Sequence, residues 1–292
     1  MSPRDFAAYA YLSLAWGLSF LLLLHVVDAF GWIGAVTFRC FIAGALLYAI
    51  ARIMRRRLDF GAGWLPFTIV GATTVAGQLI GLSYATPLIG TAMAAIFVAS
   101  IPLFSMVIAQ LWGLERITQA RVFGLVLGTI GIIMLVGFPA APVTGAFLLG
   151  CFAMIGSTFS AAFGSNYASR HLSGTGPWEV TIGSFIAGGI LTLPLLWFVP
   201  VPGTPVALDY LYIVALAALM SALTYVLYFS LVKSIGATAA ISVEFAVTVV
   251  AVLVGALVLD EALTMLQLFG GGVIILGCAL VLGLVRLPKP AS

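Results

Sequence analysis

Two opposite charges interrupt stretches of sequence that are otherwise apolar. Glu244 lies about eight residues into one such stretch, and Arg39 lies about seven residues into another. A charge at the centre of a bilayer costs roughly 2.5–3.5 kcal/mol on insertion scales. One interpretation is a buried Glu244–Arg39 pair that ties two helices together. The other is that Glu244 lines a central cavity, where it binds a substrate ammonium or a proton.

Polar and aromatic side chains in other apolar stretches could complete such a cavity. The amide of Gln78 offers a donor and an acceptor to a substrate carboxylate or ammonium, although an interhelical hydrogen bond would explain it equally well. Trp16 lies in mid-stretch beside a glycine, where an aromatic wall would favour stacking with an aromatic or broadly apolar substrate. We expect the substrate-binding residues to be Trp16, Gln78, Phe97, Tyr225, Ser242 and Glu244.

The composition indicates that these residues lie in an integral membrane protein. The chain is 63% hydrophobic and only 7% charged, with a mean hydropathy of +1.24, whereas soluble domains have about 25% charged residues. A helix of about 20 apolar residues crosses the hydrocarbon core, and the sequence predicts an all-α fold with ten transmembrane helices. These run over residues 6–27, 32–52, 64–86, 90–112, 118–138, 145–169, 178–199, 208–232, 236–259 and 264–285.

The second half of the sequence repeats the first at a shift of 146 residues. The segment L-E-R-I-T at residues 114–118 falls on D-E-A-L-T at residues 260–264. Two glycines of the first half also fall on glycines of the second, Gly124 on Gly270 and Gly131 on Gly277. The chain is therefore an internal duplication.

An odd number of crossings in each half fixes how the two copies are related. After five crossings, the second copy must enter the membrane from the opposite side. We therefore expect a first five-helix repeat over residues 1–144 and an inverted second repeat over residues 145–292. Inverted repeats are typical of secondary transporters, in which two oppositely facing halves exchange conformations.

The basic residues indicate the orientation in the membrane. When the loops are assigned alternately to the two sides, one side collects every basic residue except Arg39. These residues are Arg4, Arg52, Arg55, Arg56, Arg57, Arg116, Arg121, Arg170, Lys233, Arg286 and Lys289. Because positive charge marks the cytoplasmic side, we expect a multi-pass protein of the cell inner membrane with both termini in the cytoplasm. The run at residues 52–57 is expected to meet anionic lipid headgroups, and nucleic-acid binding is not expected.

The sequence lacks the motifs of membrane enzymes. No Gly-rich phosphate loop ends in a lysine, and no nucleophile elbow has a histidine partner. Cys40, Cys151 and Cys278 lie inside predicted helices and are expected to be small packing residues. His25 and His171 lie at helix ends, far apart in sequence. We therefore expect no enzyme activity, no cofactor and no metal site.

Several motifs together resemble those of a known family. They are A-W-G-L-S-F at residues 15–20, G-L-S-Y-A-T at 81–86, G-T-A-M-A-A-I at 90–96 and L-E-R-I-T at 114–118. The pattern is similar to that of the EamA-type drug/metabolite transporters and covers nearly the whole chain. This resemblance implies ten helices, inverted five-helix halves and transport of small metabolites, often outward. Within the superfamily the chain is most similar to the YddG-type aromatic amino acid exporters.

The chain departs from the family pattern at one place. The glutamate–arginine pair of the family is present as Glu115-Arg116, but the second copy reads Glu261-Ala262. The basic partner is missing from the second copy, which argues against a symmetrical role for the pair.

These observations predict a secondary transporter that exports small amphipathic metabolites by alternating access, with amino acids, and aromatic ones above all, as favoured substrates. Pro102 is expected to kink the fourth span and make it a gating element. The expected partners are the small-molecule substrate, the lipid bilayer and, if transport is coupled, protons. The chain is expected to be a monomer or weak dimer. A nucleotide-sugar or sugar-phosphate carrier, a channel and a membrane enzyme are the alternatives.

Overall fold

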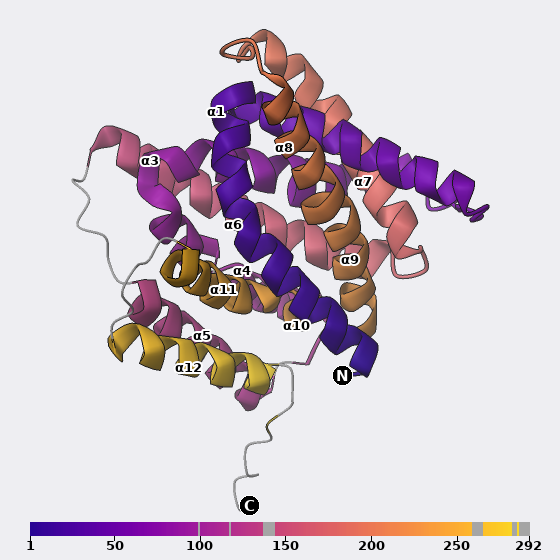
Figure 1. Ribbon diagram of the computed structural model, residues 1–292. Coiled ribbons are helices and arrows are strands. Elements are labelled where there is room, and N and C mark those ends of the chain that lie inside the picture. The colour runs from indigo at the N-terminus through magenta and orange to yellow at the C-terminus, as the bar shows by residue number, and fades with distance from the viewer. Residues whose placement is uncertain (99, 117, 137–143, 259–264, 282–284, 286–292) are drawn as a thin grey trace, which may run out of the picture.

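The computed structural model shows an all-helical protein, and it describes residues 1–98, 100–116, 118–136, 144–258, 265–281 and 285 (Figure 1). The first half contains α1 (Pro3–Ile53), α2 (Trp64–Val70), η1 (Gly71–Gly77), α3 (Gln78–Val98), α4 (Ile101–Leu111) and α5 (Gln119–Val136). The second half contains α6 (Gly145–His171), α7 (Pro177–Thr192), η2 (Leu193–Trp197), α8 (Ala207–Ala217), η3 (Ala218–Ala222), α9 (Leu223–Ile235), α10 (Ala237–Ile241), α11 (Val243–Val258) and α12 (Met265–Val281).

Within the described residues these segments follow one another as ten helical spans, as the sequence predicts. Five stretches are long and apolar enough to cross a membrane, and three shorter apolar helices accompany them. The predicted ends of the fifth, ninth and tenth spans lie outside the described residues. The second-half motif at residues 260–264, Arg286 and Lys289 lie outside them too.

Three of the turns between spans are made by single glycines. Gly31, inside α1, has a φ of +73°, and the chain reverses there between the first and second spans. Gly90, inside α3, has a φ of +81°, and Gly236, between α9 and α10, has a φ of +88°. Positive φ favours glycine because it has no Cβ. Gly90 and Gly236 are 146 residues apart, so the repeat extends to the backbone geometry.

The third and eighth spans share a second distortion of the backbone. Each contains a π-helical segment, η1 at Gly71–Gly77 and η3 at Ala218–Ala222. At a shift of 146 residues, η1 overlaps η3. Such segments occur often at functional sites, because they shift the register of the helix and re-aim its groups.

The fifth and tenth spans make a close contact between the halves. A Cβ atom on Gly124 would lie 2.8 Å from the carbonyl oxygen of Gly277, and one on Gly131 would lie 2.9 Å from that of Gly270. Gly124 therefore contacts the repeat mate of Gly131, and Gly131 contacts the repeat mate of Gly124. The earlier glycine of α5 meets the later glycine of α12, and the later one meets the earlier. The two helices run in opposite directions, as an inverted repeat requires, and small residues let their backbones meet. They lie side by side at one end of the molecule (Figure 1).

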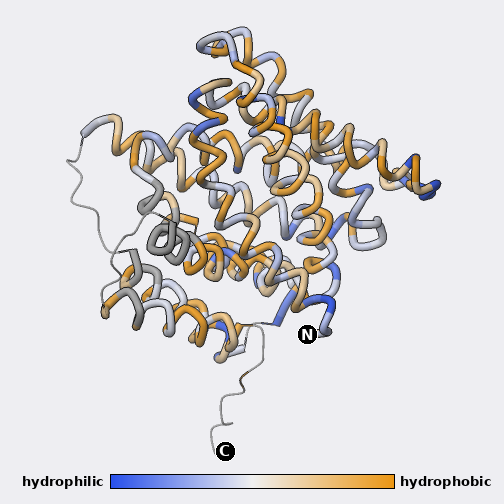
Figure 2. The backbone as a smooth tube through the Cα atoms, in the orientation of Figure 1, coloured by the Kyte–Doolittle hydropathy of each residue, from blue (hydrophilic) through white to orange (hydrophobic). Residues whose placement is uncertain are grey.

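The outer surface of the bundle is apolar. Large side chains such as Phe152, Leu111 and Ile190 are more than half exposed. Orange and pale residues run along the helices, whereas blue residues gather mainly near the ends of α1 (Figure 2). A surface with this much exposed hydrocarbon suits a lipid environment rather than water.

Basic loops that are distant in sequence lie at one end of the bundle. The guanidinium of Arg56 lies 5.3 Å from the ring centre of Trp178, at the start of α7. Arg170, at the end of α6, lies 5.6 Å from the ring of Trp112, which follows α4. These contacts join three of the loops that the charge pattern assigns to the cytoplasmic side.

The fourth and ninth spans are both interrupted, at different places. In the fourth, α3 ends at Val98 and α4 begins at Ile101, so Pro102 lies in the first turn of α4. A proline there leaves no helical hydrogen bond unmade, so the expected mid-helix kink is replaced by a break just before it. In the ninth, the interruption is at Ser242, and Thr248, the repeat mate of Pro102, lies inside α11. The gating role of Pro102 stays a prediction.

Candidate functional site

A small cavity lies between the two halves of the chain. Its volume is about 50 Å³. It is lined by Trp16, Ser19, Leu23, Arg39, Gln78, Leu79, Leu82, Val98, Tyr225, Glu244 and Val247. Four of the six expected binding residues therefore meet here, from four different spans: Trp16, Gln78, Tyr225 and Glu244.

The volume of this cavity is too small for a metabolite. One water molecule occupies about 30 Å³ in the liquid, whereas ligand pockets measure about 300–1,000 Å³. A molecule the size of an amino acid could enter only after the surrounding helices separate.

Aromatic rings form one wall of the cavity. The ring centres of Trp16 and Tyr225 are 5.8 Å apart, at an interplanar angle of 65°. Tyr228 lies 5.6 Å from Trp16, and Phe185 lies 4.9 Å from Tyr225. The hydroxyl of Tyr225 donates a hydrogen bond of 3.4 Å to the carbonyl of Thr74 in η1, so the π-helical segment of the first half holds the ring of the second.

Arg39 reaches the cavity from the second span. It is buried, and its Nε donates a hydrogen bond to Ser221 Oγ. Its Nη2 donates to the carbonyl of Met220 at 3.1 Å, and both partners belong to η3. The other π-helical segment therefore positions the guanidinium. From the sequence, Arg39 was expected to be a partner for Glu244, although a charge within an apolar span is also a signal for a lining residue.

Glu244 lies in the first turn of α11 and is also buried. Among the described residues, no cationic group lies within 4.0 Å of its carboxylate, so it forms no direct ion pair with Arg39. Its place near a helix N-terminus is favourable for a negative charge. The cavity thus holds a guanidinium and a carboxyl group that form no ion pair with each other.

Two of the six expected residues do not line this cavity. The hydroxyl of Ser242 donates a 2.7 Å hydrogen bond to the carbonyl of Ala239 and lies 3.2 Å from the hydroxyl of Tyr9. It is satisfied within the protein and connects the ninth span to the first. Phe97 is half-buried beside the core, and its neighbour Val98 lines the cavity instead. Adjacent helical residues point about 100° apart, and here it is Val98 and not Phe97 that faces the site.

Hydrogen bonds connect the fourth, sixth and ninth spans at the basic end of the bundle. Glu115 Oε1 accepts from the backbone N–H of Thr238 at 3.2 Å. The hydroxyls of Ser105 and Thr238 are 3.5 Å apart, and the amide of Asn166 donates to Ser105 Oγ at 2.9 Å. These contacts hold the halves together on that side of the cavity.

The acid of the family motif has a different partner from the one that its sequence suggests. Glu115 Oε2 accepts a hydrogen bond of 2.8 Å from Nη1 of Arg121, six residues further on, rather than from the adjacent Arg116. Glu115 therefore links the start of the fifth span to the start of the ninth through Thr238.

Histidines, cysteines and acids are scattered over the described part of the chain. No group of three or more His, Cys, Asp or Glu among them could hold a metal ion. Cys40, Cys151 and Cys278 are free, and Cys40 and Cys278 are buried.

Comparison with known proteins gives consistent matches over most of the chain. The model of the EamA-like transporter family matches residues 7–137 and again residues 148–283. An uncharacterized transporter of Archaeoglobus fulgidus is 25% identical over 272 residues, which cover 91% of this chain and 94% of the relative. The uncharacterized inner membrane transporter YedA of Escherichia coli K12 is 27% identical over 282 residues, covering 94% and 90%.

A solved crystal structure has the same fold. It superposes with a TM-score of 0.80 over 97% of this chain and 98% of its own, at 18% sequence identity. At that identity the likeness extends to the arrangement of helices and not to the substrate.

Proposed function

The chain belongs to the EamA-like transporter family, and on that basis we propose that it carries small zwitterionic metabolites across the cell membrane. It is a multi-pass transporter and not an enzyme. The proposed substrates are amino acids, with aromatic ones favoured as in the YddG-type exporters, and the proposed direction is export. The proposed location is the inner membrane, with both termini in the cytoplasm.

The single observation that carries this proposal is that a guanidinium and a carboxyl group line one cavity. Arg39 and Glu244 both line it without pairing with each other. A guanidinium matches the geometry of a carboxylate, and a carboxylate accepts hydrogen bonds from an ammonium. An α-amino acid carries both groups, so it would satisfy both buried charges at once.

The aromatic wall supports a substrate with an apolar side chain. Trp16 and Tyr225 lie on the wall of the cavity that also carries the two charges. Stacking on such rings is worth about 0.5–1.5 kcal/mol beyond the burial of area. A phosphorylated sugar would instead call for several cations, and Arg39 is the one cationic residue among the described residues that line this cavity.

Transport follows from the inverted repeat. In the proposed cycle, residues 1–144 and 145–292 form the two halves, which rock about the fixed cavity, as in other transporters built from inverted repeats. The hydrogen bonds of Glu115, Ser105 and Asn166 would close the cytoplasmic side in the present state. They would break when the cavity opens inward. Glu244 would bind the substrate ammonium or, in a coupled cycle, a proton.

The experiment is a counterflow assay in proteoliposomes loaded with unlabelled phenylalanine. We expect labelled phenylalanine to accumulate transiently, and external phenylalanine to compete. Phenethylamine, which lacks the carboxylate, and 3-phenylpropanoate, which lacks the ammonium, should compete weakly. Empty liposomes provide the baseline. Equal competition by all three compounds, or counterflow with phosphorylated sugars alone, would contradict the proposal.

A further inference from the structure

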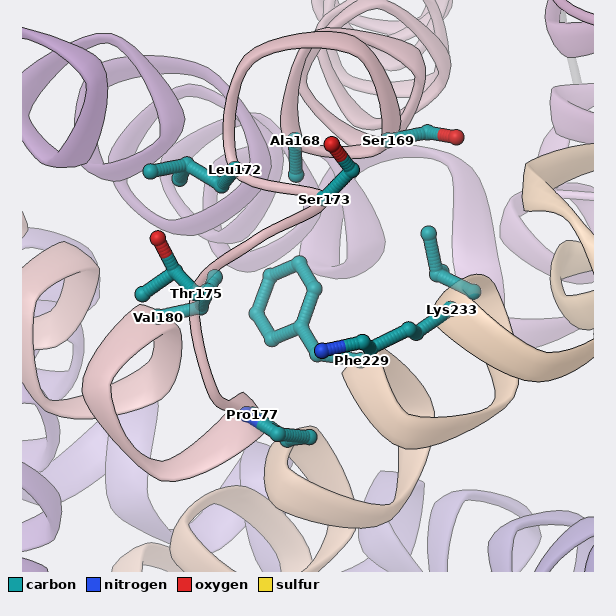
Figure 3. Close-up of a pocket in the computed structure, with 10 residues that line it drawn as sticks. Ala168, Ser169, Leu172, Ser173, Thr175, Pro177, Val180, Phe229 and Lys233 are labelled. Carbon is teal, nitrogen blue, oxygen red and sulfur yellow. The ribbon is translucent and has the colours of Figure 1, made fainter. Parts of the chain in front are cut away.

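A second and larger pocket lies at the basic end of the bundle. Its volume is about 300 Å³, which reaches the lower limit of ligand pockets, about 300–1,000 Å³. It is formed where α6 ends, α7 begins and α9 ends. Its lining residues are Ala168, Ser169, Leu172, Ser173, Thr175, Pro177, Val180, Phe229, Val232 and Lys233 (Figure 3).

The lining of this pocket combines one charge with apolar walls. Lys233 is the one charged residue in the lining, and its side chain extends toward the middle of the pocket (Figure 3). No carboxylate in the described part of the chain lies within 4.0 Å of its ammonium. The nearby acid Glu179 is buried but does not line the pocket. Phe229 and Leu172 supply hydrocarbon surface.

The pocket and the central cavity are separated by one turn of α9. Tyr225 lines the central cavity, and Phe229, four residues later, lines the larger pocket. The two ring centres are 6.1 Å apart, and both side chains are buried. Phe229 therefore lies between the larger pocket, which has room for a small ligand, and the central cavity, which does not.

We propose that the larger pocket binds a small amphipathic anion, with the ammonium of Lys233 as its counter-ion. The apolar part of the ligand would lie against Phe229, Leu172 and Val180. A cation above an apolar wall selects molecules that carry a negative group at one end and hydrocarbon at the other. That a zwitterionic substrate, held there by its carboxylate, would then pass Phe229 into the central cavity rests on the proposed function, whereas the binding of an anion in the pocket does not.

Two sources supply this chemistry, a soluble carboxylate and an anionic lipid headgroup. The test uses a variant in which Cys40, Cys151 and Cys278 are replaced by alanine and Thr175 by cysteine, in nanodiscs of phosphatidylcholine. The rate at which N-ethylmaleimide labels Thr175→Cys reports whether the pocket is filled. With 3-phenylpropanoate at about ten times its Kd, we expect labelling to slow about tenfold by mass action. Phenethylamine should leave the rate unchanged.

Variants separate the role of Lys233 from general effects of charge. Lys233→Gln should abolish the protection, Lys233→Arg should keep it, and Arg57→Gln, at an exposed cation of the same end, should not change it. If phosphatidylglycerol in the nanodisc slows labelling in a Lys233-dependent way, the occupant is a lipid. If neither anion protects, or Lys233→Gln is protected as well as the parent, the proposal is overturned.

One further variant separates this proposal from the proposed function. Glu244→Gln alters the central cavity and not the larger pocket, so protection by 3-phenylpropanoate should persist in it. Protection without any counterflow of phenylalanine would leave the anion site standing and remove the proposed function. Counterflow of phenylalanine without protection would support the proposed function and remove the anion site.

Discussion

Two regions join the halves of the chain: the contact between α5 and α12, and the central cavity. Repeat-equivalent residues are the same in the first region and differ in the second. At the contact, Gly124 meets Gly277 and Gly131 meets Gly270, so each half supplies the same residues. This part of the molecule is built twice from one pattern.

The charged residues of the cavity are supplied only once. At a shift of 146 residues, the mate of Arg39 is Phe185, and the mate of Glu244 is Val98. Val98 lines the same cavity as Glu244, so the cavity collects equivalent positions from both halves. Repeat-equivalent positions therefore form the walls of the cavity, and the ionisable side chains stand at positions where the two halves differ.

The largest expected effect is on transport, when either charge is removed from the cavity. A hydrogen bond to a charged group is worth about 1.5–3 kcal/mol. Arg39→Gln and Glu244→Gln should therefore each lower kcat/KM for phenylalanine counterflow by about 10- to 150-fold. Val98→Ile changes the mate of Glu244 in the same cavity and should have a much smaller effect. A comparable loss in all three would mean that packing, and not charge, decides activity.

A second effect concerns the symmetric contact. Gly124→Ala would place a Cβ atom 2.8 Å from the carbonyl of Gly277, and Gly277→Ala one 2.7 Å from the carbonyl of Gly124. We expect each to destabilise the fold by about 1–3 kcal/mol through overpacking, measured as a lower thermal midpoint in detergent.

Gly272 provides a matched control on the same helix. No heavy atom of the described residues lies within 4 Å of a Cβ atom there, so Gly272→Ala should leave the midpoint unchanged or raise it. Equal midpoints for all three variants would show that the close contact of α5 and α12 is not needed.

A third effect tests the aromatic wall. Trp16→Leu should weaken the binding of phenylalanine by about 0.5–1.5 kcal/mol, which is a few-fold to about tenfold in apparent affinity. The apparent affinity for free alanine as a substrate should fall less. In the first span the repeat aligns at a shift of 147 residues, which places A-W-G-L-S-F at residues 15–20 on A-F-G-S-N-Y at 162–167 and pairs Trp16 with Phe163. Phe163 packs against Trp112 and does not line the cavity. Phe163→Leu should therefore not discriminate between the two substrates. If it does so as strongly as Trp16→Leu, the wall has been assigned to the wrong residue.

The smallest effect is expected at Pro102. Its position in the first turn of α4 makes Pro102→Ala nearly neutral for stability, within about 0.5 kcal/mol. Without the proline, the break between α3 and α4 can close into a longer helix, so we expect the rate of exchange to change by a few-fold. Pro194→Ala, at a similar position in η2 and remote from the cavity, is the control. An unchanged exchange rate would remove the gating role from Pro102.

The sequence was sufficient for the spans and for much of the cavity. Apolar length predicted ten helices. The shift of 146 residues paired Gly124 with Gly270 and Gly131 with Gly277, but it did not predict that α5 and α12 meet at these glycines. The cost of a buried charge identified Glu244 directly, but placed Arg39 only as its partner. The sequence alone gave no way to determine the rotation of a helix, which turned Val98 inward and Phe97 aside.

Other features depend on contacts that no local pattern reveals. The two π-helical segments have ordinary apolar sequences, yet they hold Tyr225 and Arg39 in place. The hydroxyl of Ser242 donates its hydrogen bond to the carbonyl of Ala239. The position of this serine near a buried acid in the sequence did not indicate that bond. The pocket at Lys233 is formed by segments some sixty residues apart in the sequence. From the charge pattern, that lysine indicated only which side of the membrane its loop lies on.

The most direct test of the central claim, that one cavity between inverted halves opens alternately to each side, is labelling at Ser19, which lines it. In the cysteine-free background, Ser19→Cys is exposed to a membrane-impermeant maleimide from one side of the vesicle at a time, with and without phenylalanine. The account predicts labelling from either side, and a rate that phenylalanine lowers from both. Labelling from one side only, whatever substrate is present, would contradict it.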